Sequence, residues 1–180
     1  MKNEQILLGH GSGGKLSHDL IKEVFISHFN NEILLEQEDS AILNIDSDKI
    51  AFTTDSYVVD PVFFSGGNIG KLAVAGTVND IAVSGAKPLF MSASFIIEEG
   101  FSISELESIV KTMSNEAKNA GVKIVTGDTK VVNKGKCDKI FINTTGIGLF
   151  NNNYSKPGIS RIKAGDKILI NGSIGDHGMT

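Results

Sequence analysis

Residues 70–85 read GKLAVAGTVNDIAVSG, a stretch that is apolar on every side of a helix yet carries Asn79 and Asp80 near its end. This composition predicts a helix that is buried against a sheet, and Gly85 followed by Pro88 supplies its stop signal. An ionised carboxylate that is buried without a partner costs several kcal/mol. We therefore expect Asp80 to be buried beside a cation, a hydrogen-bond network or the wall of a binding site.

The segments on either side of this helix alternate between helical and strand patterns. Leu16 to Phe29 and Ser102 to Asn119 each carry apolar residues at helical spacing, which in the second segment are Leu106, Ile109, Val110, Met113 and Ala117. Both Ser102 with Glu105 and Ser104 with Glu107 fit a capping box at its start, and Gly121 is its stop signal. The strand candidates are Ala41–Ile45, Ile50–Thr54, Pro88–Ile97, Val122–Thr126 and Lys139–Leu149. The first two are separated by DSDK, which predicts a β-hairpin. We expect an α+β fold in which a mixed β-sheet carries helices packed on one face.

Length and charge limit the classes of protein. The 180 residues suffice for one domain and a remnant, and we expect a boundary near NNNYSKPG, with residues 1–152 forming the domain and residues 153–180 beginning a second, truncated one. The net charge of -4 gives no basic surface for nucleic acid or for an anionic membrane. A single cysteine, Cys137, and the lack of an apolar leader or membrane-length segment predict a cytoplasmic protein. Another strand is expected to begin at Lys167–Asn171.

The segment GHGSGGK, residues 9–15, is rich in glycine and precedes the first predicted helix. It fits the GxxxxGK spacing of a P-loop, but Leu16 stands where a Ser or Thr would bind magnesium. It also fits GxGxxG, but the apolar run before it is too short for a Rossmann strand. Free backbone amides, Lys15 and a helix N-terminus still favour an anion. A flexible linker is the alternative interpretation. His10 lies in this segment and could contact phosphate, but we expect it to be solvated.

Four aspartates lie beside predicted strands or near the end of the central helix: Asp39, Asp55, Asp80 and Asp128. Each alone is also a common turn or cap residue. If they converge, two carboxylates about 4 Å apart repel by about 4 kcal/mol at an effective dielectric constant of about 20. A hard cation relieves this repulsion. Mg²⁺ with a polyphosphate is the simplest occupant, because Mg²⁺ keeps several waters and takes few carboxylates.

Several long motifs occur in order: GHGSGGK, QEDSA, TTDSYVVDPVFFSGGNIGKLAVAGTVNDIAVSGAKP, SFIIEEG, GVKIVTGDTKVV and KIFINTTGIG. On these motifs, residues 8–150 resemble the HypE family of hydrogenase expression/formation proteins, which are carbamoyl dehydratases. That family is related to aminoimidazole ribonucleotide synthetase (PurM), thiamine-monophosphate kinase and selenophosphate synthetase. The motifs shared across this superfamily are Asn79–Pro88 and Gly127–Thr129 in this chain.

The resemblance implies a PurM-like N-terminal domain that pairs with its copy through the sheets, forming a β-barrel in a homodimer, and a cleft that holds ATP and Mg²⁺. The implied metal ligands are Asp39, Asp55, Asp80 and Asp128. The implied catalytic residues are Asp80 and Lys15. The implied nucleotide contacts are Gly11, Gly13, Gly14, Lys15, Asp55, Asn79, Gly127 and Thr129. The implied partners are the carbamoyltransferase HypF and the HypC–HypD scaffold.

The implied reaction is the ATP-dependent dehydration of an S-carbamoyl group on the enzyme's C-terminal cysteine to a thiocyanate, which supplies the cyanide ligand of a nickel–iron hydrogenase. Transfer of phosphate to the amide oxygen turns a poor leaving group into a good one. Cys137 does not match that terminal cysteine, and we expect these 180 residues to hold the ATP-binding half and to be inactive alone. The alternatives are another enzyme of the superfamily, such as a small-molecule kinase or a selenophosphate synthetase, and a non-catalytic dimerisation or docking module.

Overall fold

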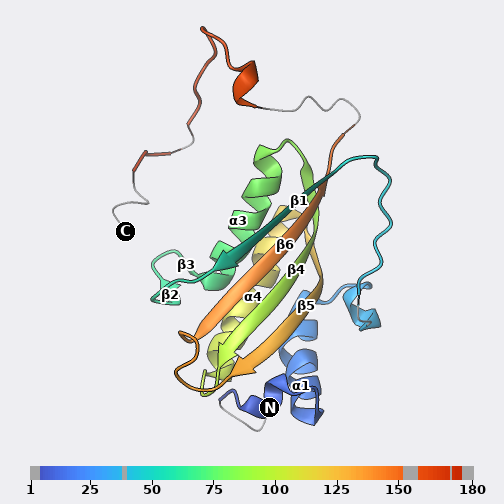
Figure 1. Ribbon diagram of the computed structural model, residues 1–180, viewed down its shortest axis with the longest axis vertical. Coiled ribbons are helices and arrows are strands. Elements are labelled where there is room, and N and C mark those ends of the chain that lie inside the picture. The colour runs from blue at the N-terminus through green and yellow to red at the C-terminus, as the bar shows by residue number, and fades with distance from the viewer. Residues whose placement is uncertain (1–4, 38–39, 152–157, 171, 176–180) are drawn as a thin grey trace.

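The computed structural model describes residues 5–37, 40–151, 158–170 and 172–175. Its centre is a mixed four-stranded sheet with the strand order β1-β6-β4-β5, which Figure 1 views with the long helices behind it. The strands are β1 (Ile50–Tyr57), β4 (Lys87–Glu98), β5 (Lys123–Val132) and β6 (Ile140–Leu149). β1 and β4 each pair antiparallel with β6, whereas β4 and β5 are parallel. The expected α+β fold with a mixed sheet is confirmed.

The two long helices cover the same face of the sheet. Helix α3 (Ile69–Val83) contacts β1 and β6, and helix α4 (Ile103–Ala120) provides the crossover that the parallel strands β4 and β5 require. A small unit of β2 (Phe63–Phe64) and β3 (Gly67–Asn68) precedes α3. The remaining elements are η1 (Leu8–Gly11), α1 (Lys15–Leu20), η2 (Ile21–Ile26), α2 (Ser27–Phe29), η3 (Leu34–Glu36) and η4 (Ile159–Arg161).

Helix α4 begins and ends where its sequence predicts. The Ser102 side chain accepts a hydrogen bond from the Glu105 backbone N–H at 3.4 Å, and Gly121 ends the helix in the left-handed conformation at φ 69°. The predicted inner face is buried and consists of Leu106, Ile109, Val110, Met113 and Ala117. Cap signals and helical periodicity therefore predict this element correctly.

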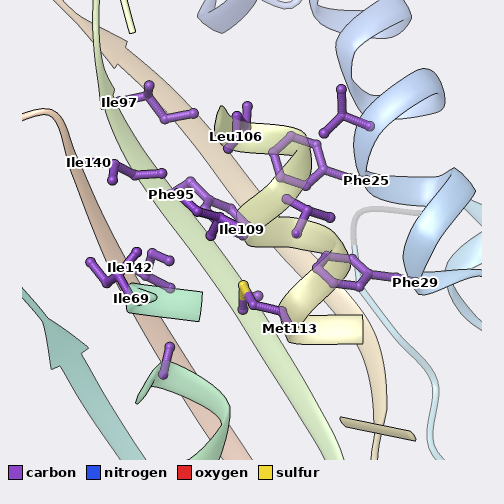
Figure 2. Packing of buried hydrophobic residues seen from close by; sticks show 14 of the residues in the cluster. Phe25, Phe29, Ile69, Phe95, Ile97, Leu106, Ile109, Met113, Ile140 and Ile142 are labelled. Carbon is purple, nitrogen blue, oxygen red and sulfur yellow. The ribbon is translucent and has the colours of Figure 1, made fainter. Parts of the chain in front are cut away.

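The hydrophobic core lies between the sheet and α4. Figure 2 shows Phe95 and Ile97 of β4 and Ile140 and Ile142 of β6 pointing toward α4, with Phe25 and Phe29 from the N-terminal helical run closing the other side. That run corresponds to the predicted helix Leu16–Phe29, although its middle part, η2, is a π-helix. The core thus joins the sheet, α4 and the N-terminal helical run into one packed unit.

Helix α3 packs on the sheet, but the expectation that Asp80 is buried is wrong. Its buried residues form one stripe, namely Ile69, Gly70, Ala73, Val74, Thr77 and Ile81. Asn79 and Asp80 are exposed, as are the side chains of Leu72 (40 %) and Val83 (75 %). The physical reason is that small apolar residues suit a helix on all sides, whereas among the described residues α3 packs mainly against the sheet and α4.

The predicted hairpin of Ala41–Ile45 with Ile50–Thr54 is also wrong. Residues 41–47 form no strand in the described chain, and β1 pairs instead with β6, with Asp55 opposite Thr144. The DSDK turn is a local signal, but strand pairing is decided by a partner that lies far along the sequence. β1 is consequently an edge strand of the described sheet.

The C-terminal part has few contacts among the residues that the structure describes. Residues 167–170 form no strand, contrary to the prediction, and Asn171 lies outside the described residues. Ile168 and Leu169 are 93 % and 90 % exposed, so they lack the packing that a strand on this domain would have. Within the described ranges, no helix has the length and apolar character needed to cross a membrane.

Candidate functional site

The predicted site residues fall into two groups at opposite edges of the sheet. Asp55 lies on β1 and Asp128 on β5, which are the outermost strands. The register pairs Asp55 with Thr144, Thr144 with Ala93, and Ala93 with Gly127, so the two acids lie at nearly the same height across the sheet. Three strand spacings of about 4.8 Å separate β1 from β5 by about 14 Å.

The first group lies between β1 and α3. Asp55 Oδ2 accepts a hydrogen bond from the Tyr57 hydroxyl at 3.1 Å and lies 3.5 Å from Thr77 Oγ1. Asp80 Oδ2 accepts a hydrogen bond from Thr53 Oγ1 at 3.0 Å. Thr53, Asp55 and Tyr57 alternate along β1, so their side chains share the face toward α3. Two carboxylates are therefore held near each other along one strand–helix boundary.

A buried network supports this boundary from beneath. Thr77 Oγ1 and Thr144 Oγ1 lie 2.6 Å apart, and Thr144 donates to the Ala73 carbonyl at 3.3 Å. Both threonines are fully buried, and every hydroxyl in the network has a partner. Burial, with a smaller contribution from the Asp55 charge, raises the pKa of Tyr57, so its hydroxyl keeps its proton at neutral pH and can donate.

The second group lines a cavity of about 370 Å³ between the N-terminal helical run and strands β4 and β5. Five predicted nucleotide or metal residues contribute to its wall, namely Gly11, Gly13, Gly127, Asp128 and Thr129. A Cβ on Gly11 would lie 2.6 Å from the Val131 backbone nitrogen, and a Cβ on Gly127 would lie 2.1 Å from the Ala93 carbonyl oxygen. Glycine is thus required for the close approach of these backbones.

His10 and Ser17 shape the glycine-rich segment, and the sequence analysis did not single out Ser17. Ser17 Oγ donates to the His10 carbonyl at 2.7 Å and accepts from the Gly13 N–H at 2.9 Å, which ties the segment to α1. His10 is 2 % exposed, so the expectation that it is solvated is wrong. Its Nδ1 accepts from the Leu7 N–H at 2.8 Å, and burial lowers its pKa. The one signal in the sequence was the position of Ser17 on the inner side of the first helical turn.

The charged residues of the second group are exposed. Asp128 accepts from the Thr129 N–H at 2.8 Å and lies 3.4 Å from the Lys130 ammonium. Lys15 is exposed in the first turn of α1, next to Gly14. This edge therefore offers backbone amides, one lysine near the segment and a carboxylate that already has a cationic neighbour.

The structure does not bring the predicted metal ligands into one cluster within a single chain. Among the described residues, no three His, Cys, Asp or Glu side chains could jointly hold a metal ion, and Asp39 lies outside the described residues. The pair of Asp55 and Asp80 still fits Mg²⁺, because this ion is usually bound by one or two carboxylates together with waters and phosphate oxygens. The metal roles of the four aspartates remain predictions.

A scan of protein families matches residues 37–150 to the AIR synthase related protein, N-terminal domain. The chain belongs to the AIR synthase related family. The match spans the sheet and both long helices of this AIR synthase related domain, including the Asp55, Asp80 and Asp128 segments.

Individual relatives of this AIR synthase related chain agree with the resemblance to HypE. Carbamoyl dehydratase HypE of Escherichia coli (strain K12) is 51 % identical over 180 residues, which cover 97 % of this chain and 53 % of that protein. The structure of HypE in complex with ATP is 54 % identical with a TM-score of 0.79, covering 81 % of this chain and 43 % of that one. A HypE–HypF complex gives 60 % identity, a TM-score of 0.56 and coverages of 73 % and 42 %. The chain spans about half the length of the curated relatives it matches.

Proposed function

We propose that this domain binds ATP with Mg²⁺ as part of a HypE-type carbamoyl dehydratase that serves the maturation of a nickel–iron hydrogenase in the cytoplasm. The observation that carries the proposal is an identity of 51 % over 97 % of the chain with a carbamoyl dehydratase, together with an ATP complex among the similar structures. At this identity the similarity favours dehydration over the small-molecule kinases and selenophosphate synthetases of the same superfamily.

The proposed reaction converts the S-carbamoyl group of a C-terminal cysteine and ATP into a thiocyanate, ADP and phosphate. The carbamoyl oxygen leaves with the transferred phosphoryl group, and the amide nitrogen loses both protons. Bound Mg²⁺ would neutralise charge on the phosphates during this transfer. Such chemistry needs positioning and charge neutralisation more than a protein nucleophile, which agrees with a site of carboxylates, amides and one lysine.

The two groups of site residues have different proposed tasks. Asp55 and Asp80, held by hydroxyls between β1 and α3, would bind the metal, with Asn79 beside them on the exposed side of α3. Gly11, Gly13, Gly14, Gly127 and Thr129 would contact the nucleotide phosphates, and the Gly13 and Thr129 N–H groups, which donate to Ser17 Oγ and Asp128 Oδ1, would exchange these bonds for phosphate oxygens. Lys15 would add positive charge at the transferred phosphate, and Asp128 and Asp39 are the remaining proposed metal ligands.

We propose that a second copy of the chain completes the site. The face of the sheet away from the helices leaves the side chains of Ile50 (48 %), Phe52 (65 %) and Ile96 (43 %) exposed, which favours contact with another sheet. If two such faces close into a barrel, the β1 edge of one chain meets the β5 edge of its partner. The metal-binding pair of one chain would then face Asp128 and the glycine-rich wall of the other.

Two further partners are proposed for the whole protein. Interaction with HypF is supported by the solved HypE–HypF complex, to which this chain is 60 % identical. Interaction with the HypC–HypD scaffold rests on the resemblance to the HypE family alone. Both belong to a protein that carries this domain together with the remaining half of its relatives' length.

Isothermal titration with Mg²⁺-ATP tests the nucleotide site. The chain is expected to bind with saturation, and Asp80→Asn should weaken binding by more than about 100-fold, since even the loss of an outer-shell partner costs about 10- to 100-fold in metal affinity. Asp138→Asn, an exposed aspartate between β5 and β6, is the matched control and should bind normally. Equal affinity in Asp80→Asn would refute the role of Asp80. If the parent chain were a folded dimer that binds no ATP, the nucleotide site would be refuted and a dimerisation and docking module would be favoured instead.

A further inference from the structure

Tyr57 touches the proposed metal ligand Asp55 without belonging to the proposed ligand set. Its hydroxyl donates to Asp55 Oδ2 at 3.1 Å, and its ring is half-buried between β1 and α3. The two residues are two apart on β1, so both side chains lie on the face toward α3. A donor at this distance restricts how the carboxylate can rotate.

The tyrosine hydroxyl is itself held in place. Thr77 Oγ1 lies 3.4 Å from it, and Thr77 is fixed by its 2.6 Å contact with Thr144. Helix α3 carries Gly76 where the ring passes, and a Cβ at that position would lie 2.2 Å from the Tyr57 hydroxyl oxygen. The hydroxyl therefore occupies space that exists because residue 76 is glycine.

The direction of these contacts leaves one carboxylate oxygen for a ligand. The Tyr57 hydroxyl donates to Oδ2 of Asp55, and Thr77 Oγ1 lies 3.5 Å from the same oxygen while its one proton serves the shorter contact with Thr144. A carboxylate whose Oδ2 accepts from the tyrosine hydroxyl presents Oδ1 in a restricted direction. Such outer contacts orient metal ligands, and their loss typically costs about 10- to 100-fold in metal affinity.

We propose that Tyr57 is a positioning residue, whose hydroxyl holds Asp55 so that Oδ1 meets the Mg²⁺ of a bound nucleotide. This inference rests on the proposed function, because it takes Asp55 to be a metal ligand. The role of the hydroxyl can be separated from the buried network, because the Thr77–Thr144 and Thr144–Ala73 contacts do not include Tyr57.

The test is the affinity for ATP measured by isothermal titration at a series of free Mg²⁺ concentrations. Mg²⁺ is expected to tighten the binding of ATP, and Tyr57→Phe should raise the Mg²⁺ concentration at which half of this gain in affinity is reached by about tenfold. The ATP affinity at saturating Mg²⁺ should change by less than about twofold. Gly76→Ala should shift the Mg²⁺ dependence in the same direction, because its methyl group displaces an intact tyrosine hydroxyl. Asp55→Asn should abolish the tightening by Mg²⁺, and Ser108→Ala, an exposed hydroxyl of α4, should behave like the parent chain.

The possible results distinguish a failure of the role of Tyr57 from a failure of the proposed nucleotide site. An unchanged Mg²⁺ dependence in Tyr57→Phe, together with the loss in Asp55→Asn, would overturn the role of Tyr57 and leave the nucleotide site standing. If Tyr57→Phe lowered the ATP affinity by the same factor at every Mg²⁺ concentration, the role of Tyr57 would also be overturned, because that pattern is expected from a general disturbance of the fold. An unchanged Asp55→Asn would overturn the metal role of Asp55 and the inference with it. Thermal unfolding of each variant checks that the fold is intact.

Discussion

At the β1 edge of the sheet the candidate site is built from side chains, whereas at the β5 edge it is built largely from backbone. Asp55 and Asp80 are held by hydroxyls, and fully buried threonines lie beneath Asp55. At β5, Gly11 and Gly127 bring main chain close to main chain around a cavity. Carboxylates suit a magnesium ion and amides suit phosphate, so each edge supplies one half of what a magnesium–nucleotide complex requires.

The distance between the two edges explains why a single chain carries the expected motifs without bringing them together in one site. The strand order places β1 and β5 on opposite edges, about 14 Å apart at three strand spacings. A closed arrangement of two sheets removes both edges and joins unlike ones.

Thr77→Val removes the buried hydroxyl on which the β1 edge rests. The substitution leaves Thr144 with one partner fewer and weakens the hold on Asp55, and we expect it to lower the free energy of unfolding by about 1–3 kcal/mol. Urea denaturation followed by circular dichroism measures this. Thr53→Val is the matched control: it removes the hydroxyl beside the exposed Asp80, where water can replace it, so the expected loss is below about 0.5 kcal/mol. Equal losses would show that burial of the network is unimportant.

Gly11→Ala disturbs the β5 edge and leaves the carboxylates alone. Its Cβ would lie 2.6 Å from the Val131 nitrogen and must push the glycine-rich segment away from β5. We expect ATP affinity to fall about tenfold, which corresponds to about 1.4 kcal/mol or roughly one lost amide contact, with an unchanged Mg²⁺ dependence. Gly9→Ala, whose Cβ meets the flexible end of Leu16, serves as the control. A changed Mg²⁺ dependence in Gly11→Ala would contradict the proposal that the β1 edge binds the metal and the β5 edge binds the phosphates.

The smallest effect concerns the protonation of His10 beneath the glycine-rich segment. Burial lowers the pKa of His10 from 6.5, so the unfolded chain binds its proton more readily than the folded one. This stabilising contribution is present above pH 6.5 and is lost as the pH falls through the lower folded-state pKa. The urea midpoints of the parent chain and of His10→Gln are measured from pH 8 to pH 5. The same pH dependence in both would show that His10 contributes nothing. We expect a steeper decline in the parent.

Elements with strong local signals were predictable from the sequence. The capping serine, the left-handed glycine and the helical period gave α4, and the long apolar runs gave β4 and β6. The prediction of Val122–Thr126 captured the start of β5, which continues to Val132 because GDT lies within the strand. Those signals are carried by neighbouring residues and do not depend on the rest of the fold.

Features that depend on distant partners were not predictable. The DSDK turn suggested a hairpin, but β6 supplies the actual partner of β1. The apolar composition of α3 did not reveal that one of its sides is exposed among the residues that the structure describes, so Asp80 was expected to be buried. The motifs identified the candidate residues, but their division between two edges follows from strand order. The domain boundary near residue 152 remains a prediction.

The most direct test of the shared site mixes two inactive chains. Asp80→Asn damages the β1 edge and Asp128→Asn the β5 edge, and each variant alone should bind little Mg²⁺-ATP. After unfolding together and refolding, random pairing of two copies should restore about one quarter of the sites, because one site of each mixed dimer has both edges intact. Titration of the mixture should show tight binding at that stoichiometry. Binding no greater than the sum of the separate variants would contradict a site shared between two chains.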